Sequence, residues 1–249
     1  MESRNVEQIP RPAVIFGALE TRQGFDPSEY GWGYEDFGLA SSGTLPAPFA
    51  TAKTGANSVA GDYVNDAAGG TYALTTTTDN EAQTNRLDWG NQRTLPVTEG
   101  TVLIVRFKVA FDATGTSGLP NTGDQIVVGL ANDHNATLDS VTEHAWFRIE
   151  GPSLNLLYEA DDGTTDTSDQ DTGKDLVDDT YISVGIYIDE DERANFYYKS
   201  AGSRWEHVGG ASIAAASSAF QPYIRIGKAA AANYDHTLTT DCVAWAWKR

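Results

Sequence analysis

The sequence predicts an all-β protein, an antiparallel β-sandwich preceded by an extended N-terminal arm. Three observations lead to this prediction. Apolar and polar residues alternate along many short segments, which is the period of a strand with one buried face. Short clusters of Gly, Pro, Asp and Asn separate these segments, as in the turns of a sandwich. Finally, no long segment carries the apolar spacing of a helix, and no repeat of fixed period suggests a propeller or a solenoid.

The clearest pattern lies in residues 181–208. Its first part alternates aliphatic residues with polar or aromatic ones, at Ile182, Val184, Ile186 and Ile188. The acidic run from Asp189 to Glu192 cannot be buried without partners, so we expect it to form a solvated turn. A second strand around Phe196 and a third around Trp205 follow. Three strands joined by short polar turns predict an antiparallel meander with one face in a core.

The remaining strands are predicted from the same alternation. Segments 72–76 and 84–89 are expected to pair with each other across the polar residues between them. Segment 101–111 is the most regular strand, because every second residue from Leu103 to Phe111 is apolar. We expect further strands at 126–130, 145–149, 154–158, 220–228 and 241–248. The Asp-rich segment 161–171 is expected to be a solvated loop.

The predicted sandwich occupies residues 51–249, and residues 1–50 form the predicted arm. Prolines at positions 10 and 12 favour an extended backbone near the start. The aromatic residues that follow are uncommon in disordered tails, so the segment is expected to pack on its own domain or on a neighbouring subunit. If it is a docking arm, its partner-binding residues are Arg11, Phe25, Tyr30, Trp32, Tyr34 and Phe37.

The composition of the 249 residues argues against several classes of partner. The formal net charge is −18, from 35 acidic against 17 basic residues. Such a surface repels DNA, RNA and anionic lipid, so we expect neither a nucleic-acid nor a membrane partner. No signal peptide or membrane-spanning run is expected. The single cysteine, Cys242, lies on the small-residue face of a predicted strand, where we expect it to pack as a small side chain.

The succession of an aliphatic strand, an acidic turn, an Ala-x-Phe-Tyr strand and a short strand around Trp205 resembles the concanavalin A-like jelly rolls. That superfamily includes legume-type lectins, laminarinase-type glucanases and domains of tailed-phage particles. The resemblance covers about residues 72–248 and implies a jelly-roll sandwich. The proline- and aromatic-containing N-terminal segment and the Thr-, Gly-, Ala- and Asp-rich composition are similar to those of phage decoration or fibre proteins.

The resemblance implies a function of one of three kinds. The first is a non-enzymatic structural protein on the surface of a bacteriophage particle, such as a capsid decoration protein, assembled in the host cytoplasm. Its arm would bind the major capsid protein or further copies of itself in a homo-oligomer. The alternative is a carbohydrate-binding module for host attachment. Its glycan would contact exposed rings from the set Trp146, Tyr158, Tyr187, Tyr197 and Trp205.

A glycoside hydrolase is the third hypothesis. Glucanases of the superfamily carry Glu-x-Asp-x-x-Glu or Glu-x-Asp-x-Glu along one strand, where two carboxyl groups can lie about 5 Å apart. The sequence has two near matches. Glu159 and Asp161 lack the final glutamate, and the run from Asp189 to Glu192 lies where a turn is expected. We therefore expect no catalytic residue.

We also expect no metal and no other cofactor. The Asp-rich segment does not match the Asp-x-Asp-x-Asp-Gly calcium loop. Its carboxylates are nevertheless ligands that calcium prefers, so calcium binding by this segment remains an alternative. The histidines lack the ligand spacing of zinc sites. They are His134, His144, His207 and His236.

Overall fold

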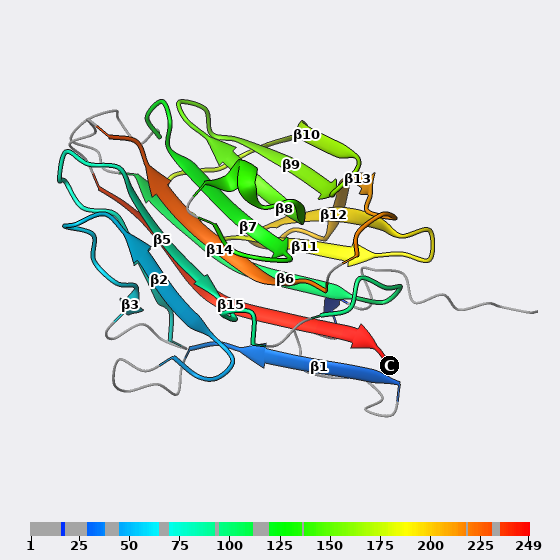
Figure 1. Ribbon diagram of the computed structural model, residues 1–249. Helices are drawn as coiled ribbons and strands as arrows, with labels where there is room; N and C mark the ends of the chain where they lie inside the picture. Colours follow the sequence, from blue (N-terminus) through cyan, green and yellow to red (C-terminus); the bar gives the residue numbers. More distant parts are fainter. Residues whose placement is uncertain are drawn as a thin grey trace, which may run out of the picture.

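The computed structural model describes residues 16–17, 29–37, 45–64, 70–92, 95–111, 120–135, 137–217, 219–230 and 235–249. They form two antiparallel sheets that pack face to face, which confirms the predicted all-β jelly-roll sandwich (Figure 1). A single turn of 3₁₀ helix, η1, spans Leu138–Ser140. Within the described residues, no helix reaches the length and apolarity that a membrane span requires.

The first sheet has eight strands. They are β1 (Tyr30–Glu35), β3 (Asp62–Tyr63), β4 (Tyr72–Thr75), β6 (Val102–Phe111), β11 (Ile182–Ile188), β12 (Arg193–Ser200), β13 (Glu206–Ser212) and β15 (His236–Lys248). Their order is β13-β12-β11-β6-β15-β4-β3, and β1 also pairs with β15. The most regular predicted strand, β6, therefore lies at the centre of this sheet, and the predicted meander β11-β12-β13 forms one side of it.

The second sheet has seven strands. They are β2 (Ala50–Thr54), β5 (Gln83–Asp88), β7 (Gln125–Ala131), β8 (Glu143–Glu150), β9 (Asn155–Asp162), β10 (Asp166–Asp175) and β14 (Gln221–Lys228). Their order is β10-β9-β8-β7-β14-β5-β2. One edge of this sheet thus consists of three strands that follow one another in the chain, β8, β9 and β10, and they carry the candidate site described below.

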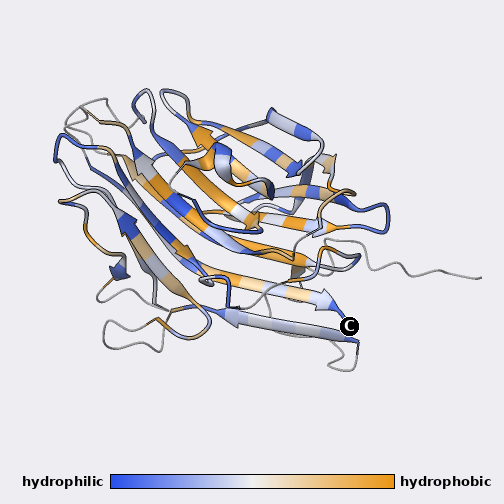
Figure 2. Cartoon of the chain, viewed as in Figure 1, coloured by the Kyte–Doolittle hydropathy of each residue, from blue (hydrophilic) through white to orange (hydrophobic). Residues whose placement is uncertain are grey.

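The main core lies between the two sheets and is built from alternate residues of each strand. Phe107 of β6, Phe147 of β8 and Phe196 of β12 are among its fully buried side chains. Figure 2 shows hydrophobic residues concentrated along the central strands of both sheets. The acidic turn lies outside this core, as predicted, and the Asp189 carboxylate accepts hydrogen bonds from the N–H groups of Asp191 and Arg193, both at 3.0 Å.

The predicted pairing of segments 72–76 and 84–89 is wrong. β4 pairs with β15 in the eight-stranded sheet, whereas β5 pairs with β14 in the seven-stranded sheet. The two strands therefore face each other across the core, with Leu74 and Leu87 both fully buried between the sheets. Two strands that each have one apolar face can bury it as neighbours in one sheet or as strands of opposite sheets. Their residue pattern is the same in both arrangements.

The interpretation of segment 161–171 as a loop is also wrong. β9 extends to Asp162, and β10 runs antiparallel to it as the edge strand of the sheet. The pairing shifts register between Thr167 and Gln170 and again between Asp171 and Lys174. Aspartate has low intrinsic strand propensity, but an edge strand gains its backbone hydrogen bonds from one neighbour while its charged side chains stay in water.

The segment expected to be an arm contributes to the sandwich itself. Tyr30, Trp32 and Tyr34 lie in β1, which pairs with β15. Phe37 lies in the core between the two sheets. It is fully buried and its ring centroid lies 5.7 Å from those of Phe49 and Tyr72. Its interpretation as a partner-binding residue is therefore corrected: a core aromatic and an interface aromatic look alike in the sequence.

Phe16 is fully buried on the outer face of the eight-stranded sheet, although no local pattern in the sequence distinguishes it. Its ring centroid lies 4.9 Å from that of Tyr197 and 4.7 Å from that of Trp205. The ring occupies the space above Gly185, where an added Cβ would come within 2.9 Å of it. Part of the expected arm thus packs in cis. Arg11 and Phe25 lie outside the described residues.

Candidate functional site

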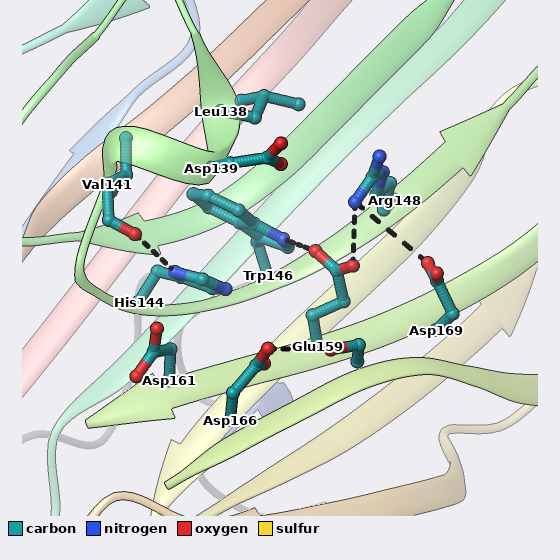
Figure 3. Close-up of a pocket in the computed structure, with 11 residues that line it drawn as sticks. Leu138, Asp139, Val141, His144, Trp146, Arg148, Glu159, Asp161, Asp166 and Asp169 are labelled. Atoms are coloured by element: carbon teal, nitrogen blue, oxygen red, sulfur yellow. Dashed lines mark hydrogen bonds and ion pairs between the residues drawn. The ribbon is translucent and has the colours of Figure 1, made fainter. Parts of the chain in front are cut away.

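A pocket of about 320 Å³ opens on the outer face of the seven-stranded sheet, over β8, β9 and β10 (Figure 3). The loop that contains η1 forms one wall, because Leu138 and Val141 pack on Trp146 there. The charged and aromatic residues that line the pocket are Asp139, His144, Trp146, Arg148, Glu159, Asp161, Asp166 and Asp169.

Strand alternation explains why so many polar side chains meet at this pocket. In β8, Ala145, Phe147 and Ile149 face the core, so the residues between them face outward. The same alternation in β9 turns Glu159 and Asp161 outward.

Strand register then aligns these outward residues. His144 of β8 lies opposite Asp161 of β9, and Asp161 lies opposite Asp166 of β10. One row of the sheet thus holds an imidazole and two carboxylates from three neighbouring strands. Trp146 and Glu159 are cross-strand partners two residues away, in a second row.

Glu159 is held by two donors. The Trp146 indole N–H donates to its Oε2, and the Arg148 guanidinium donates to its Oε1 at 2.8 Å. Burial raises the pKa of Glu159, whereas these two hydrogen bonds favour its charged form. Arg148 also lies 3.1 Å from the Glu150 carboxylate and 3.9 Å from that of Asp169. The guanidinium that lines the pocket is therefore already neutralised by carboxylates of the chain itself.

His144 is a neutral hydrogen-bond acceptor in this pocket. Its ring stacks on Trp146 with centroids 3.5 Å apart, and the residue is 7% exposed. Burial lowers the pKa of His144 to about 4. Nδ1 lies 3.1 Å from the Val141 carbonyl, which can only accept, so Nδ1 carries the proton. Nε2 therefore presents a lone pair, has no hydrogen-bond partner among the described residues, and points into the pocket (Figure 3).

Asp161 and Asp166 place two carboxylates opposite each other beside this imidazole. One Asp161 oxygen accepts from the Gly163 N–H at 2.8 Å, and one Asp166 oxygen accepts from the Ser168 hydroxyl at 2.8 Å. Burial raises the pKa of Asp161, and the charge of Asp166 raises it further. Within the part of the chain that the structure describes, no three His, Cys, Asp or Glu side chains come together in a way that could hold a metal ion.

The aromatic residues expected to contact a glycan do not form an exposed surface. Trp146 is 1% exposed under the η1 loop, and Tyr187 is buried as well. Tyr158 packs between the sheets against Phe196, at 4.8 Å between centroids. The other two rings, of Tyr197 and Trp205, are the ones that contact Phe16.

Glu159 and Asp161 were recognised in the sequence as an incomplete hydrolase motif. His144 was considered there only as a zinc ligand and Asp166 only as part of the Asp-rich segment, and neither was expected beside Asp161. Two outward carboxylates on one strand were the available signal. Which residues lie opposite these carboxylates depends on the strand register, which the sequence alone does not determine.

Cys242 packs as predicted: it is buried, and burial raises the pKa of its thiol to about 11.

No protein-family model matches the sequence, and no curated protein sequence matches it either. Solved structures do match. A protein of unknown function from Shewanella oneidensis MR-1 has a TM-score of 0.60 and 13% identity, covering 96% of this chain and 94% of that one. The carbohydrate recognition domain of Emp47p has a TM-score of 0.58 and 12% identity, covering 90% and 99%. The winged bean acidic lectin in complex with methyl-α-D-galactose has a TM-score of 0.58 and 8% identity, covering 89% and 100%. The chain therefore has the jelly-roll fold of the concanavalin A-like lectins.

Proposed function

We propose that this chain is a non-enzymatic carbohydrate-binding domain whose glycan site is the pocket over β8, β9 and β10. The observation that carries the proposal is the row of His144, Asp161 and Asp166, whose side chains line one pocket. Carboxylates and an unprotonated imidazole nitrogen accept hydrogen bonds, and the hydroxyl groups of a sugar donate them. The glycan-binding lectins that share the fold support the same class of ligand.

The size of the pocket suits a small ligand. Its volume of about 320 Å³ lies at the lower end of the roughly 300–1,000 Å³ that ligand pockets occupy. Each member of the row belongs to a paired strand and not to a loop, so inter-strand pairing fixes its backbone position. A pre-formed site loses less conformational entropy when the ligand binds.

The state of Glu159 supports binding without hydrolysis. A retaining glycosidase needs one carboxyl group as acid and base and a second as nucleophile. Both Glu159 oxygens already accept hydrogen bonds, from Trp146 and Arg148. The carboxylate is thereby used to fix the two side chains that form the base of the pocket.

A glycan array tests the proposal. We expect the wild-type chain to bind a set of related glycans with dissociation constants in the millimolar range or better. Asp161→Asn is expected to weaken this binding. Asp171→Asn serves as the matched control, because Asp171 is an exposed residue of β10 that does not line the pocket. The absence of any glycan signal would contradict the proposal, and so would binding that Asp161→Asn leaves unchanged. Release of reducing ends from a bound glycan would contradict its non-enzymatic part.

A structural role on the surface of a bacteriophage particle is the second candidate, favoured by the surface of β1. Trp32 of this strand is 43% exposed. Aromatic residues of this kind are frequent interface hot spots. In this candidate, β1 contacts a second copy of the chain.

We expect Trp32→Ser to shift the chain toward the monomer while its melting temperature changes little, because the ring is partly in water already. Multi-angle light scattering over a concentration series measures this shift. Val59→Ser, at another exposed apolar residue, is the control. A wild-type chain that stays monomeric at all concentrations would exclude contact between copies through β1.

A further inference from the structure

We infer that the ligand of the pocket over β8, β9 and β10 is a glycan with a free, protonated amino group, such as a hexosamine that is not acetylated. The inference rests on the proposed function and names the chemical class of its ligand. It comes from the charges and hydrogen-bonding capacity of the row formed by His144, Asp161 and Asp166.

The charges of the pocket favour a cation. Five carboxylates line it, together with one guanidinium, Arg148. That guanidinium is already engaged by Glu159 and Glu150. Neither Asp161 nor Asp166 makes an ion pair with any of the described residues. Two like charges opposite each other on neighbouring strands are destabilising, and a cation bound between them would remove that repulsion.

The hydrogen-bonding capacity of the row matches an ammonium group. A protonated amine donates three hydrogen bonds and accepts none. The row offers acceptors from three side chains: His144 Nε2, Asp161 and Asp166. His144 Nε2 provides independent evidence for a ligand, because the side chain is more than nine-tenths buried and this atom has no partner among the described residues. Leaving a buried polar atom unpaired is costly unless a ligand satisfies it.

The same features disfavour other sugars. N-acetylation replaces the ammonium by a neutral amide with one N–H donor and a carbonyl acceptor, so two of the three acceptors in the row would lose their donors. Acidic sugars would add a negative charge to a pocket already rich in carboxylates.

The test compares glucosamine trimers with their N-acetylated counterparts by isothermal titration calorimetry in buffer with EDTA. The titration is run at about pH 6, below the pKa of roughly 8 for an amine of this type. We expect the free amine to bind at least roughly tenfold more tightly than the acetylated trimer. Asp161→Asn and Asp166→Asn should each abolish this preference, and Asp171→Asn should retain it. Asp166→Asn should also raise the melting temperature of the free protein, because one of the two opposed charges is gone.

Each contrary outcome has a distinct meaning. Equal binding of both trimers, weakened by Asp161→Asn, would overturn the amine preference and leave the proposed glycan site intact. An amine preference that Asp171→Asn reduces as much as Asp161→Asn would show a nonspecific attraction to the acidic surface and overturn the inference. A melting temperature that rises with calcium in the wild type but not in Asp161→Asn would assign the row to a metal. No binding of either trimer, together with a blank glycan array, would overturn the proposed function itself.

Discussion

Phe107→Ala is expected to lower the free energy of unfolding by about 3–5 kcal/mol. Phe107 is 0% exposed and lies in β6, between β11 and β15 at the centre of the eight-stranded sheet. Its backbone neighbours are Ile182 on one side and Thr240 on the other. Paired strands on both sides restrict how far the surroundings can collapse, so most of the volume of the lost ring would remain as a cavity.

Urea denaturation followed by tryptophan fluorescence measures this loss. Val177→Ala is the control, because Val177 is an apolar residue that is 62% exposed. The control is expected to change the free energy of unfolding by no more than about 0.5 kcal/mol. If Phe107→Ala unfolded at the same urea concentration as the wild type, the side chain of Phe107 would not face the core.

Acidification from pH 6.5 to about 4 is expected to lower the free energy of unfolding of the wild type by about 3 kcal/mol more than that of His144→Gln. In the folded protein, burial lowers the pKa of His144 from 6.5 to about 4. Above pH 6.5 the ring is neutral in both states and contributes no pH dependence. Between pH 6.5 and 4 the unfolded chain binds the proton and the folded chain does not, so the free energy of unfolding falls with pH. Below pH 4 both states are protonated, and the loss is complete.

Comparison with His144→Gln isolates the contribution of the histidine. The groups nearest the ring include Asp161, whose raised pKa has the opposite effect, since the folded protein then binds the proton more readily than the unfolded chain. Arg148, Glu159 and Asp166 also lie in this pocket. All four are present in both proteins, and glutamine keeps an acceptor near Nε2. Denaturation curves at several pH values give the difference. Parallel curves for the two proteins would show that His144 titrates normally and is not buried as described.

The alternation of residue types was sufficient to predict most of the strands and the class of fold. β6, β14 and the first two strands of the meander, β11 and β12, lie where the period of two predicted them, because each has one face in the core and a turn at each end. The third strand was predicted around Trp205, whereas β13 begins at Glu206 and extends to Ser212. The turn at Asp189 was equally predictable, since four consecutive acids have no place in an apolar interior. Glu159 and Asp161 of β9 could also be recognised as two carboxylates on one outward face of a strand.

Only the tertiary structure decided which strands are neighbours, in which register they pair and which aromatic residues are buried, because the same alternation of residues is compatible with several arrangements. It placed β4 and β5 in opposite sheets, buried Phe37 in the core, and made β10 a strand despite its many aspartates. It also aligned His144 with Asp161 and Asp166. One hairpin turn separates His144 from Asp161 along the chain, and a second separates Asp161 from Asp166. The physical reason is the same in each case. Local sequence determines which face of a strand is apolar. The identity and register of the neighbouring strands depend on backbone hydrogen bonds and packing, and any strand with the same apolar face could make these.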